Sequence, residues 1–119
     1  MKRDWEVIRA ILLALEALGD TNSVVSAGDI KGYDAETVNY HMRMLIEKGL
    51  IEGECSEPLG GGLYCLPERL TWEGHEFLDN MRDQAMWNRV KSTIREKGIG
   101  LSFEAIKLAG KLVVQRMLS

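Results

Sequence analysis

The feature that most constrains this sequence is a capped amphipathic helix that leads directly into a glycine-rich hairpin. Asp34 is a favourable N-cap for a helix over residues 35–48, and Gly49 is a favourable stop. The apolar side chains of this segment share one helical face: Val38, Met42, Leu45 and Ile46. Two predicted strands follow, at 50–55 and 63–66, separated by a loop with a proline and three glycines that cannot continue a sheet. We therefore expect a two-stranded hairpin at about residues 50–66.

The preceding residues complete the element order of a winged helix-turn-helix. Apolar residues at helical spacing predict a first helix over residues 5–18, with Asp4 as its N-cap. A short β-prone pair at 24–25 and a brief helix at 26–31 come before the long capped helix. The predicted fold class is therefore mainly α with a small β-hairpin (α+β), with a winged helix-turn-helix core over residues 1–70 and C-terminal helices after it.

Residues 71–119 predict a helical extension within the same compact unit. One helical stretch begins after Thr71 and is interrupted by polar residues at 82–84, and a last helix runs over 103–118 behind the N-cap Ser102. This last helix is apolar on more than one side, whereas one chain buries only one face of a terminal helix. We therefore expect a homodimer whose interface includes Phe103, Ile106, Leu108, Leu112, Val113, Val114 and Met117.

The sequence favours a cytoplasmic protein without a membrane partner. No apolar run reaches the roughly 18 residues that a membrane span needs. The first residues lack the uninterrupted apolar core of a signal peptide. In the cytoplasm, Cys55 and Cys65 would stay reduced, and we expect them to be small buried side chains on the two arms of the hairpin.

The charge distribution counts against nucleic-acid binding, although the fold class favours it. The net charge is −3, but residues 1–70 hold seven Lys and Arg against twelve Asp and Glu, net −5. Residues 71–119 hold eight against six, net +2. DNA-binding modules usually carry a basic footprint. From Cys55 to Glu68 the predicted wing has no Lys or Arg, and it includes Glu57.

The helix over 35–48 is the candidate recognition helix. Such a helix enters the major groove with the N-terminal half of the face opposite its buried stripe. There Asn39 could read adenine, and Arg43 could reach guanine or a phosphate. The candidate DNA-binding residues are Lys31, Thr37, Asn39, Tyr40, Arg43, Lys48 and Arg69. A solvated helix face that never meets DNA explains the same residues, so both interpretations stay open.

Nothing in the sequence has the spacing of a catalytic, metal or cofactor site. Zinc ligands usually occur in pairs two to four residues apart, whereas the two cysteines and two histidines are widely separated. We expect His41 to be a hydrogen-bonded packing residue. The three glycines at 60–62 lie between strands and not before a helix, so they do not form a phosphate-binding loop. The protein is therefore expected to be no enzyme and to hold no metal or cofactor.

Three sets of residues carry resemblances to known families. The segment from Glu36 to Gly53 resembles the recognition helix and first wing strand of arsenical-resistance repressors, and residues 69–78 are similar to a segment of multiple-antibiotic-resistance and phenolic-acid repressors. Residues 1–5, 38–41, 70–78 and 87–91 together resemble a family of phage, prophage and bacterial proteins known only as a domain of unknown function. These resemblances imply a winged helix in a phage-related setting, and they bring no catalytic or binding residues.

Two functions from different classes follow from these observations. The first is a winged-helix DNA-binding protein, a phage- or prophage-type transcriptional regulator acting as a homodimer. The alternative is a protein–protein interaction module that uses the same fold to bind a host or phage protein and does not bind DNA. A small-molecule-responsive switch is a third possibility, and it would need a pocket that sequence does not reveal.

Overall fold

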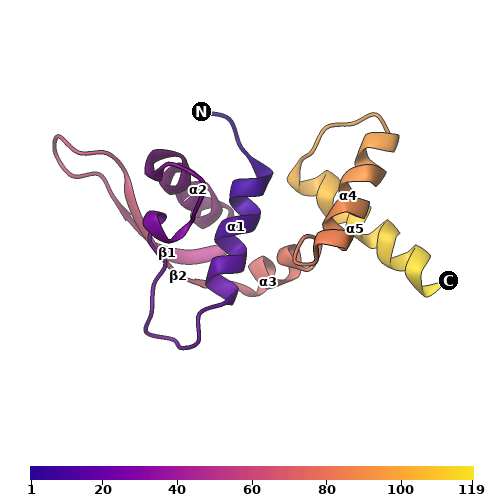
Figure 1. The fold of residues 1–119 in the computed structure, drawn as a ribbon, viewed down its shortest axis with the longest axis horizontal. Coiled ribbons are helices and arrows are strands. Elements are labelled where there is room, and N and C mark those ends of the chain that lie inside the picture. Colours follow the sequence, from indigo (N-terminus) through magenta and orange to yellow (C-terminus); the bar gives the residue numbers. More distant parts are fainter. The chain divides into compact units, whose positions relative to one another are not determined.

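The N-terminal part of the chain folds as helices followed by a hairpin, in the predicted order. The computed structural model describes residues 1–119, and its first part contains three helical elements and two strands (Figure 1). They are α1 (Trp5–Glu16), the 3-10 turn η1 (Ala27–Asp29), α2 (Ala35–Lys48), β1 (Ile51–Ser56) and β2 (Tyr64–Leu70). The two strands form one antiparallel sheet. The predicted α+β class with a small hairpin and C-terminal helices is confirmed.

Capping side chains set where the two long helices begin. Asp4 Oδ1 accepts a hydrogen bond from the Glu6 N–H at 2.9 Å, so α1 starts as predicted, although it ends two residues before Leu18. Asp34 accepts from the Thr37 N–H at 2.8 Å. Gly49 ends α2 with φ +83°, a left-handed conformation that glycine adopts without steric cost. The bounds of α2 therefore agree with those predicted.

The inner face of α2 packs into the core of this part of the chain. Val38 and Met42 are fully buried and Leu45 nearly so, whereas Ile46 at the side of the stripe is half-buried. They share the core with side chains of α1, of the strands and of the residue before β1: Val7, Ile8, Ile11, Leu12, Leu15, Leu50, Ile51 and Leu70. The apolar stripe read from the sequence therefore faces inward, and the opposite side of α2 is left at the surface.

The second strand is longer than predicted. We expected it to end near Leu66, yet β2 runs through Pro67 to Leu70. Pro67 stands opposite Gly53, where the register shifts between Glu52 and Gly53. This bulge accommodates the proline in the ladder. The Pro67 carbonyl accepts from the Val25 N–H at 3.1 Å, so the predicted β-prone pair lies beside β2 without forming a strand of its own.

The C-terminal helices form a second compact unit. The chain divides into two compact units, Met1–His75 and Glu76–Ser119, where the sequence predicted one. The division falls within α3 (Trp72–Leu78), five residues after the predicted boundary at 70. In the second unit α4 (Gln84–Glu96) begins behind the N-cap Asp83, and it packs against α5 (Phe103–Leu118). None of the helices combines the length and the apolar character that a membrane span requires.

Two residues expected at a dimer interface belong instead to the core of this second unit. Ile106 is fully buried and Val113 is 5% exposed, and Val90 on α4, the helix packed against α5, is also buried. The Phe103 ring stacks on Phe77 with ring centroids 4.6 Å apart, which leaves Phe103 half-buried. Helical periodicity had marked all apolar positions of α5 alike, and it could not separate the face that α4 covers from the rest.

Candidate nucleic-acid interface

The outward side of α2 carries fewer available polar groups than the sequence suggested. Thr37 is half-buried, and its hydroxyl donates to the Asp34 carboxylate at 3.0 Å as part of the helix cap. Tyr40 is half-buried and meets the ring of His41 edge-on, with centroids 5.7 Å apart. Two hydrogen bonds to the Asp34 carboxylate hold the pKa of Asp34 below its usual range. The bond from the Thr37 N–H has the larger effect, and the bond from the Thr37 hydroxyl has the smaller one. The cap is therefore charged at neutral pH.

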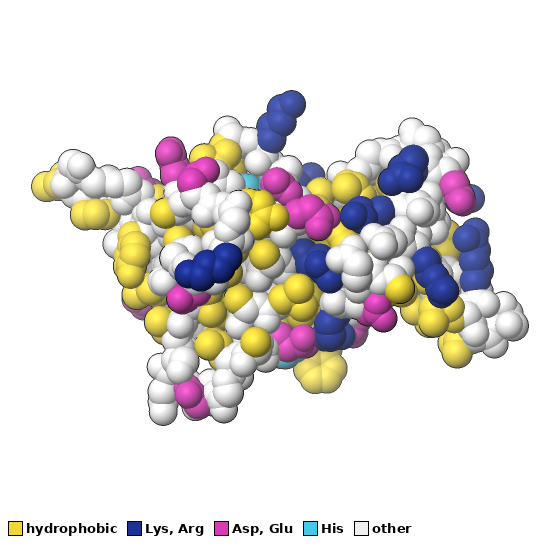
Figure 2. All heavy atoms as spheres, in the orientation of Figure 1, with side chains coloured by type: hydrophobic (Ala, Val, Ile, Leu, Met, Phe, Trp, Pro, Cys, Tyr) yellow, Lys and Arg dark blue, Asp and Glu magenta, His cyan; other side chains and the backbone are white.

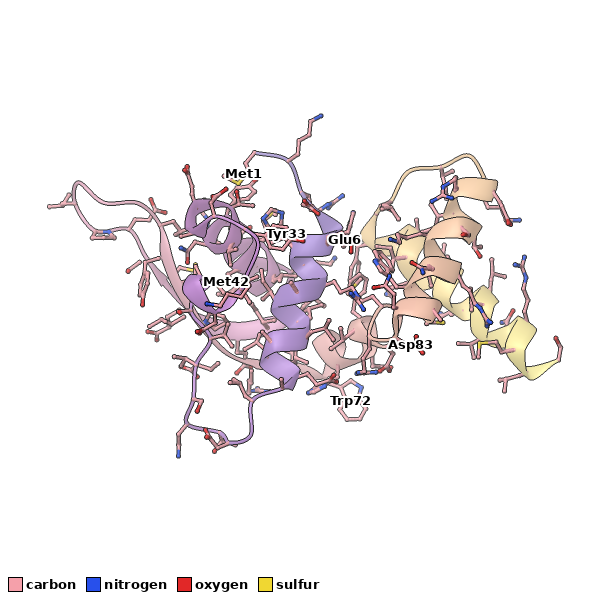
Figure 3. All side chains as sticks on the ribbon, in the orientation of Figure 1. Met1, Glu6, Tyr33, Met42, Trp72 and Asp83 are labelled. Atoms are coloured by element: carbon pink, nitrogen blue, oxygen red, sulfur yellow. A yellow bond between two sulfur atoms is a disulfide. The ribbon has the colours of Figure 1, made fainter.

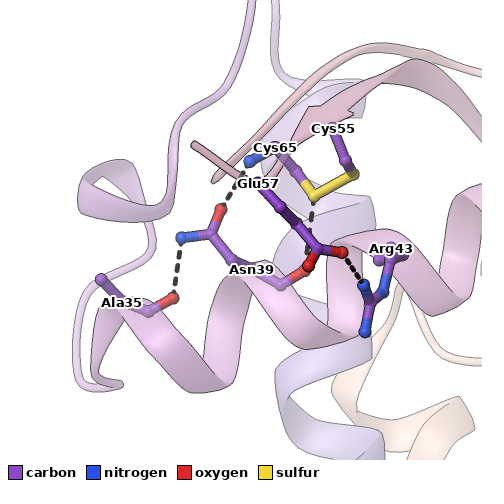
Figure 4. The surroundings of a disulfide bond; sticks show 6 residues. All are labelled: Ala35, Asn39, Arg43, Cys55, Glu57 and Cys65. Carbon is purple, nitrogen blue, oxygen red and sulfur yellow. Dashed lines mark hydrogen bonds and ion pairs between the residues drawn. A yellow bond between two sulfur atoms is a disulfide. The ribbon is translucent and has the colours of Figure 1, made fainter. Parts of the chain in front are cut away.

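Asn39 does not face outward, which corrects its predicted role in reading adenine. Its side chain is buried, Oδ1 accepts from the Cys65 N–H at 2.9 Å, and Nδ2 donates to the Ala35 carbonyl at 3.0 Å (Figure 4). Both ends of the amide are therefore occupied within the protein. The helical pattern placed Asn39 on the face opposite the apolar stripe, whereas its amide joins α2 to β2.

His41 is a buried packing residue, as expected. Its Nε2 accepts from the Asp4 N–H at 2.8 Å, so the ring proton resides on Nδ1, which donates to the Thr37 carbonyl at 2.7 Å. The neutral imidazole therefore ties the N-cap of α1 to α2. It is no ligand for a metal, because both of its nitrogens are occupied.

Arg43 is at the surface, but the hairpin engages it. Its guanidinium lies 2.7 Å from the carboxylate of Glu57, in the loop after β1 (Figure 4). Both side chains are partly exposed, at 39% and 67%. Ion pairs of this exposure contribute about 0–1 kcal/mol, so the contact can be exchanged for another anion. The arginine that could contact a base or phosphate is thus partnered by a carboxylate of the predicted wing.

The other predicted cations lie on separate parts of the first unit. The Lys31 ammonium donates to the Gly28 carbonyl at 3.1 Å, and Arg69 on β2 pairs with Glu52 on β1 at 2.7 Å. Lys48 is exposed at the end of α2. Met1–His75 holds seven Lys and Arg against thirteen Asp and Glu, net −6. In Figure 2 the hairpin tip shows apolar and uncharged atoms and no lysine or arginine.

The two cysteines form a disulfide, which corrects the expectation that both are reduced. Cys55 and Cys65 stand directly opposite each other in the ladder, and their Cα atoms are 4.0 Å apart. The Cys65 N–H bonds Asn39 and not β1, so the pair is of the non-hydrogen-bonded kind, in which cross-strand side chains are closest. Only the strand register brings the sulfurs together, and the spacing of the cysteines in the sequence did not reveal it.

Several of the predicted interface residues on α5 do remain exposed. They are Leu108, Leu112, Val114 and Met117, at 38–62% exposure, and Leu118 is exposed beyond them. A shallow groove of about 540 Å³ lies between α4 and α5, lined by apolar Val113 and Met117 and by charged Arg89 and Arg116, among others. The second unit is basic, with eight Lys and Arg against five Asp and Glu. Figure 2 shows several of these cations on the face in view.

Sequence reasoning missed Glu57 as a partner for Arg43 and Trp72 as an exposed aromatic residue. Trp72 is 74% exposed at the first turn of α3, and Figure 3 shows its ring projecting away from the helix. The capping hydroxyl of Thr71, which accepts from the Gly74 N–H at 3.0 Å, sets the helix phase that turns Trp72 outward.

These elements define a class: a small α+β protein in which a capped helix and a disulfide-linked hairpin form one surface. The chain belongs to the family described as hypothetical protein (DUF2513), whose model matches residues 2–100. It is 39% identical over 119 residues to an uncharacterized protein of Haemophilus influenzae (strain Rd), and the alignment covers both chains completely. No solved structure matches the chain. The predicted membership of a domain-of-unknown-function family is confirmed, and the resemblance to repressors stays a prediction.

Proposed function

We propose that the chain is a winged-helix DNA-binding protein, a transcriptional regulator of the phage or prophage type that acts in the cytoplasm without catalysis or a cofactor. The observation that carries the proposal is the two-sided character of α2. One side, with Val38 and Met42, is buried, and the other side lies at the surface immediately before an antiparallel hairpin. This is the arrangement in which a recognition helix can enter a major groove.

The proposed contacts follow from what the surface of α2 offers. Arg43 is the side chain that would contact a guanine edge or a phosphate, and Lys48 and Arg69 would contact phosphates. Asn39 has no part in the contact because its amide is occupied. Because the unit is acidic and offers few cations, we expect weak DNA binding. Each phosphate contact should make the slope of log affinity against log salt steeper by about 0.9, with affinity falling as salt rises.

A homodimer would double these contacts. Dimeric helix-turn-helix proteins bind two half-sites, which adds the contacts of both copies. The exposed apolar side chains of α5 support such a dimer, because monomeric proteins rarely expose a contiguous apolar patch. The proposed interface keeps Leu108, Leu112, Val114 and Met117 from the predicted set, and omits the buried Ile106 and Val113.

A second candidate, a protein-interaction module, is favoured by the outer part of the hairpin. Leu59 at the loop is fully exposed and Tyr64 is 48% exposed. No Lys or Arg occurs between Cys55 and Glu68. Exposed apolar side chains on a surface without cations suit a protein partner better than a phosphate backbone.

The discriminating experiment measures binding to the protein's own upstream DNA across a salt series, with the chain reduced. We expect the affinity to fall steeply with salt, and Arg43→Ala to weaken binding and reduce the salt slope by about one. The matched control is Arg82→Ala. Arg82 is likewise an exposed arginine in an ion pair, with Asp79, but both residues lie in the second unit. Absence of binding at low salt, or equal effects of the two variants, would contradict the proposal and favour the interaction module.

A further inference from the structure

The two ends of the Cys55–Cys65 disulfide differ in their surroundings. Cys65 is completely buried, its N–H is held by Asn39 Oδ1, and its Sγ lies 3.6 Å from the Asn39 carbonyl oxygen (Figure 4). Cys55 is exposed on β1. A dissolved thiol can therefore reach the sulfur of Cys55, whereas α2 and the hairpin cover that of Cys65.

We propose that this disulfide is a reversible thiol-exchange site, opened by a small cytoplasmic thiol of the glutathione class that attacks Cys55. The attacking thiolate forms a new S–S bond with Cys55 Sγ, the Cys55–Cys65 bond breaks, and the electron pair leaves on Cys65 Sγ, which takes up a proton. A second thiolate attacks the mixed disulfide and releases Cys55, which is then protonated. In total, two small thiols are oxidised to one small disulfide, and the protein disulfide is reduced to two thiols.

The surroundings of Cys65 accommodate the protonated thiol that remains after the exchange. A thiol at this position has the Asn39 carbonyl as an acceptor at 3.6 Å, a distance within reach of a sulfur hydrogen bond. Asn39 holds the Cys65 backbone by a contact that involves no sulfur, so it persists after the disulfide opens. The β2 arm therefore stays attached to α2, and the arm that gains freedom is β1 with the loop after it.

That freedom bears on Arg43, and this step rests on the proposed function. Glu57, the partner of Arg43, lies two residues after Cys55, and only the pair Ser56–Tyr64 follows the crosslinked pair in the ladder. With the crosslink closed, the loop is held where Glu57 meets the guanidinium. With it open, the end of the ladder can fray, Glu57 moves away, and Arg43 becomes available to a phosphate or base. The reduced form is therefore the DNA-binding form.

The exchange chemistry is tested on the oxidised full-length chain without DNA. The chain is incubated with reduced glutathione, the reaction is quenched with acid, and the mixed disulfide is located by peptide mass spectrometry. We expect glutathione on Cys55 in roughly tenfold excess over Cys65, as the difference in access implies. As a second measurement, oxidised glutathione should modify the Cys65→Ser variant much faster than the Cys55→Ser variant. A disulfide that native conditions protect from glutathione, or modification mainly on Cys65, would overturn the proposal.

The coupling to Arg43 has its own readout. The side-chain Nε–Hε signal of Arg43, observed by NMR in the oxidised and reduced chain, should shift on reduction, while that of Arg82 stays unchanged. Glu57→Gln should abolish the redox dependence of the Arg43 signal and give the oxidised chain the DNA affinity of the reduced one. An Arg43 signal insensitive to reduction would overturn the coupling. If neither form binds DNA while exchange occurs at Cys55, the proposed function fails and the exchange site stands.

Discussion

Replacing Asn39 by alanine separates its structural role from the role in DNA reading that the sequence suggested. The variant leaves the Cys65 N–H without its acceptor inside a fully buried residue, and an unsatisfied buried donor costs about 1–3 kcal/mol. The Ala35 carbonyl keeps its bond from the backbone of residue 39 within α2. Alanine has a better helix propensity than asparagine by about 0.5 kcal/mol, which offsets part of the loss.

We therefore expect Asn39→Ala to lower the free energy of unfolding by about 1–2 kcal/mol. A loss of 1 kcal/mol lowers the Tm of a domain of 60–100 residues by about 4–8 °C. Urea denaturation followed by circular dichroism measures the first quantity, and a thermal scan the second. The matched control is Asn88→Ala, which makes the same change at an exposed position of α4 and should alter stability by less than about 0.5 kcal/mol.

The result that would refute this reasoning is an Asn39→Ala variant as stable as the wild type. The DNA measurement gives a further comparison, because a structural residue should leave the salt slope of the folded variant unchanged. A variant of normal stability that loses sequence discrimination would mean that Asn39 reads bases after all.

Three other predictions concern packing, capping and assembly. Gly74→Ala should lower the free energy of unfolding by about 2 kcal/mol, because the new Cβ overlaps the Leu50 backbone oxygen. Gly110→Ala meets the Asn80 side chain, which can move, so it should lower the free energy of unfolding clearly less in the same urea titration. Because the pKa of Asp34 is lowered in the folded chain, its charge stabilises the fold above the usual carboxyl pKa, and this stabilisation is lost as pH falls through the lowered pKa. Asp34→Asn should remove this pH-dependent loss of stability, which circular dichroism between pH 7 and 2 measures. Leu112→Glu should convert a dimer to a monomer in sedimentation at micromolar concentration, and a monomeric wild type would show that the α5 interface is wrong.

Local patterns were sufficient to predict the elements of the fold. The cap Asp34 and the stop Gly49 each act through neighbouring backbone groups, so they can be read from sequence without the tertiary structure. The inward stripe of α2 was predicted for the same reason, since it depends only on helical periodicity. These local signals agree with one another, and the structure follows them.

The candidate site was harder to predict because its contacts depend on strand register. The buried amide of Asn39 accepts from the Cys65 N–H, and Arg43 is paired because the loop after β1 returns Glu57 to α2. Both partners come from the hairpin, 14 or 26 residues away in sequence. Periodicity assigns polar residues to the solvent face, and it has no information on such distant partners.

The bulged hairpin also means that the disulfide reports on how the strands align. A Cβ at Gly53 would lie 2.5 Å from the Pro67 Cα, so the arms approach too closely there for any other residue. A ladder displaced by one position would set Cys65 opposite Glu54 or Ser56 and turn its side chain to the other face. Among chains in which the hairpin has already formed, oxidation can then join the sulfurs only where the strands are in the native register. The fraction of a folded, reduced sample that air crosslinks is therefore a covalent measure of strand register.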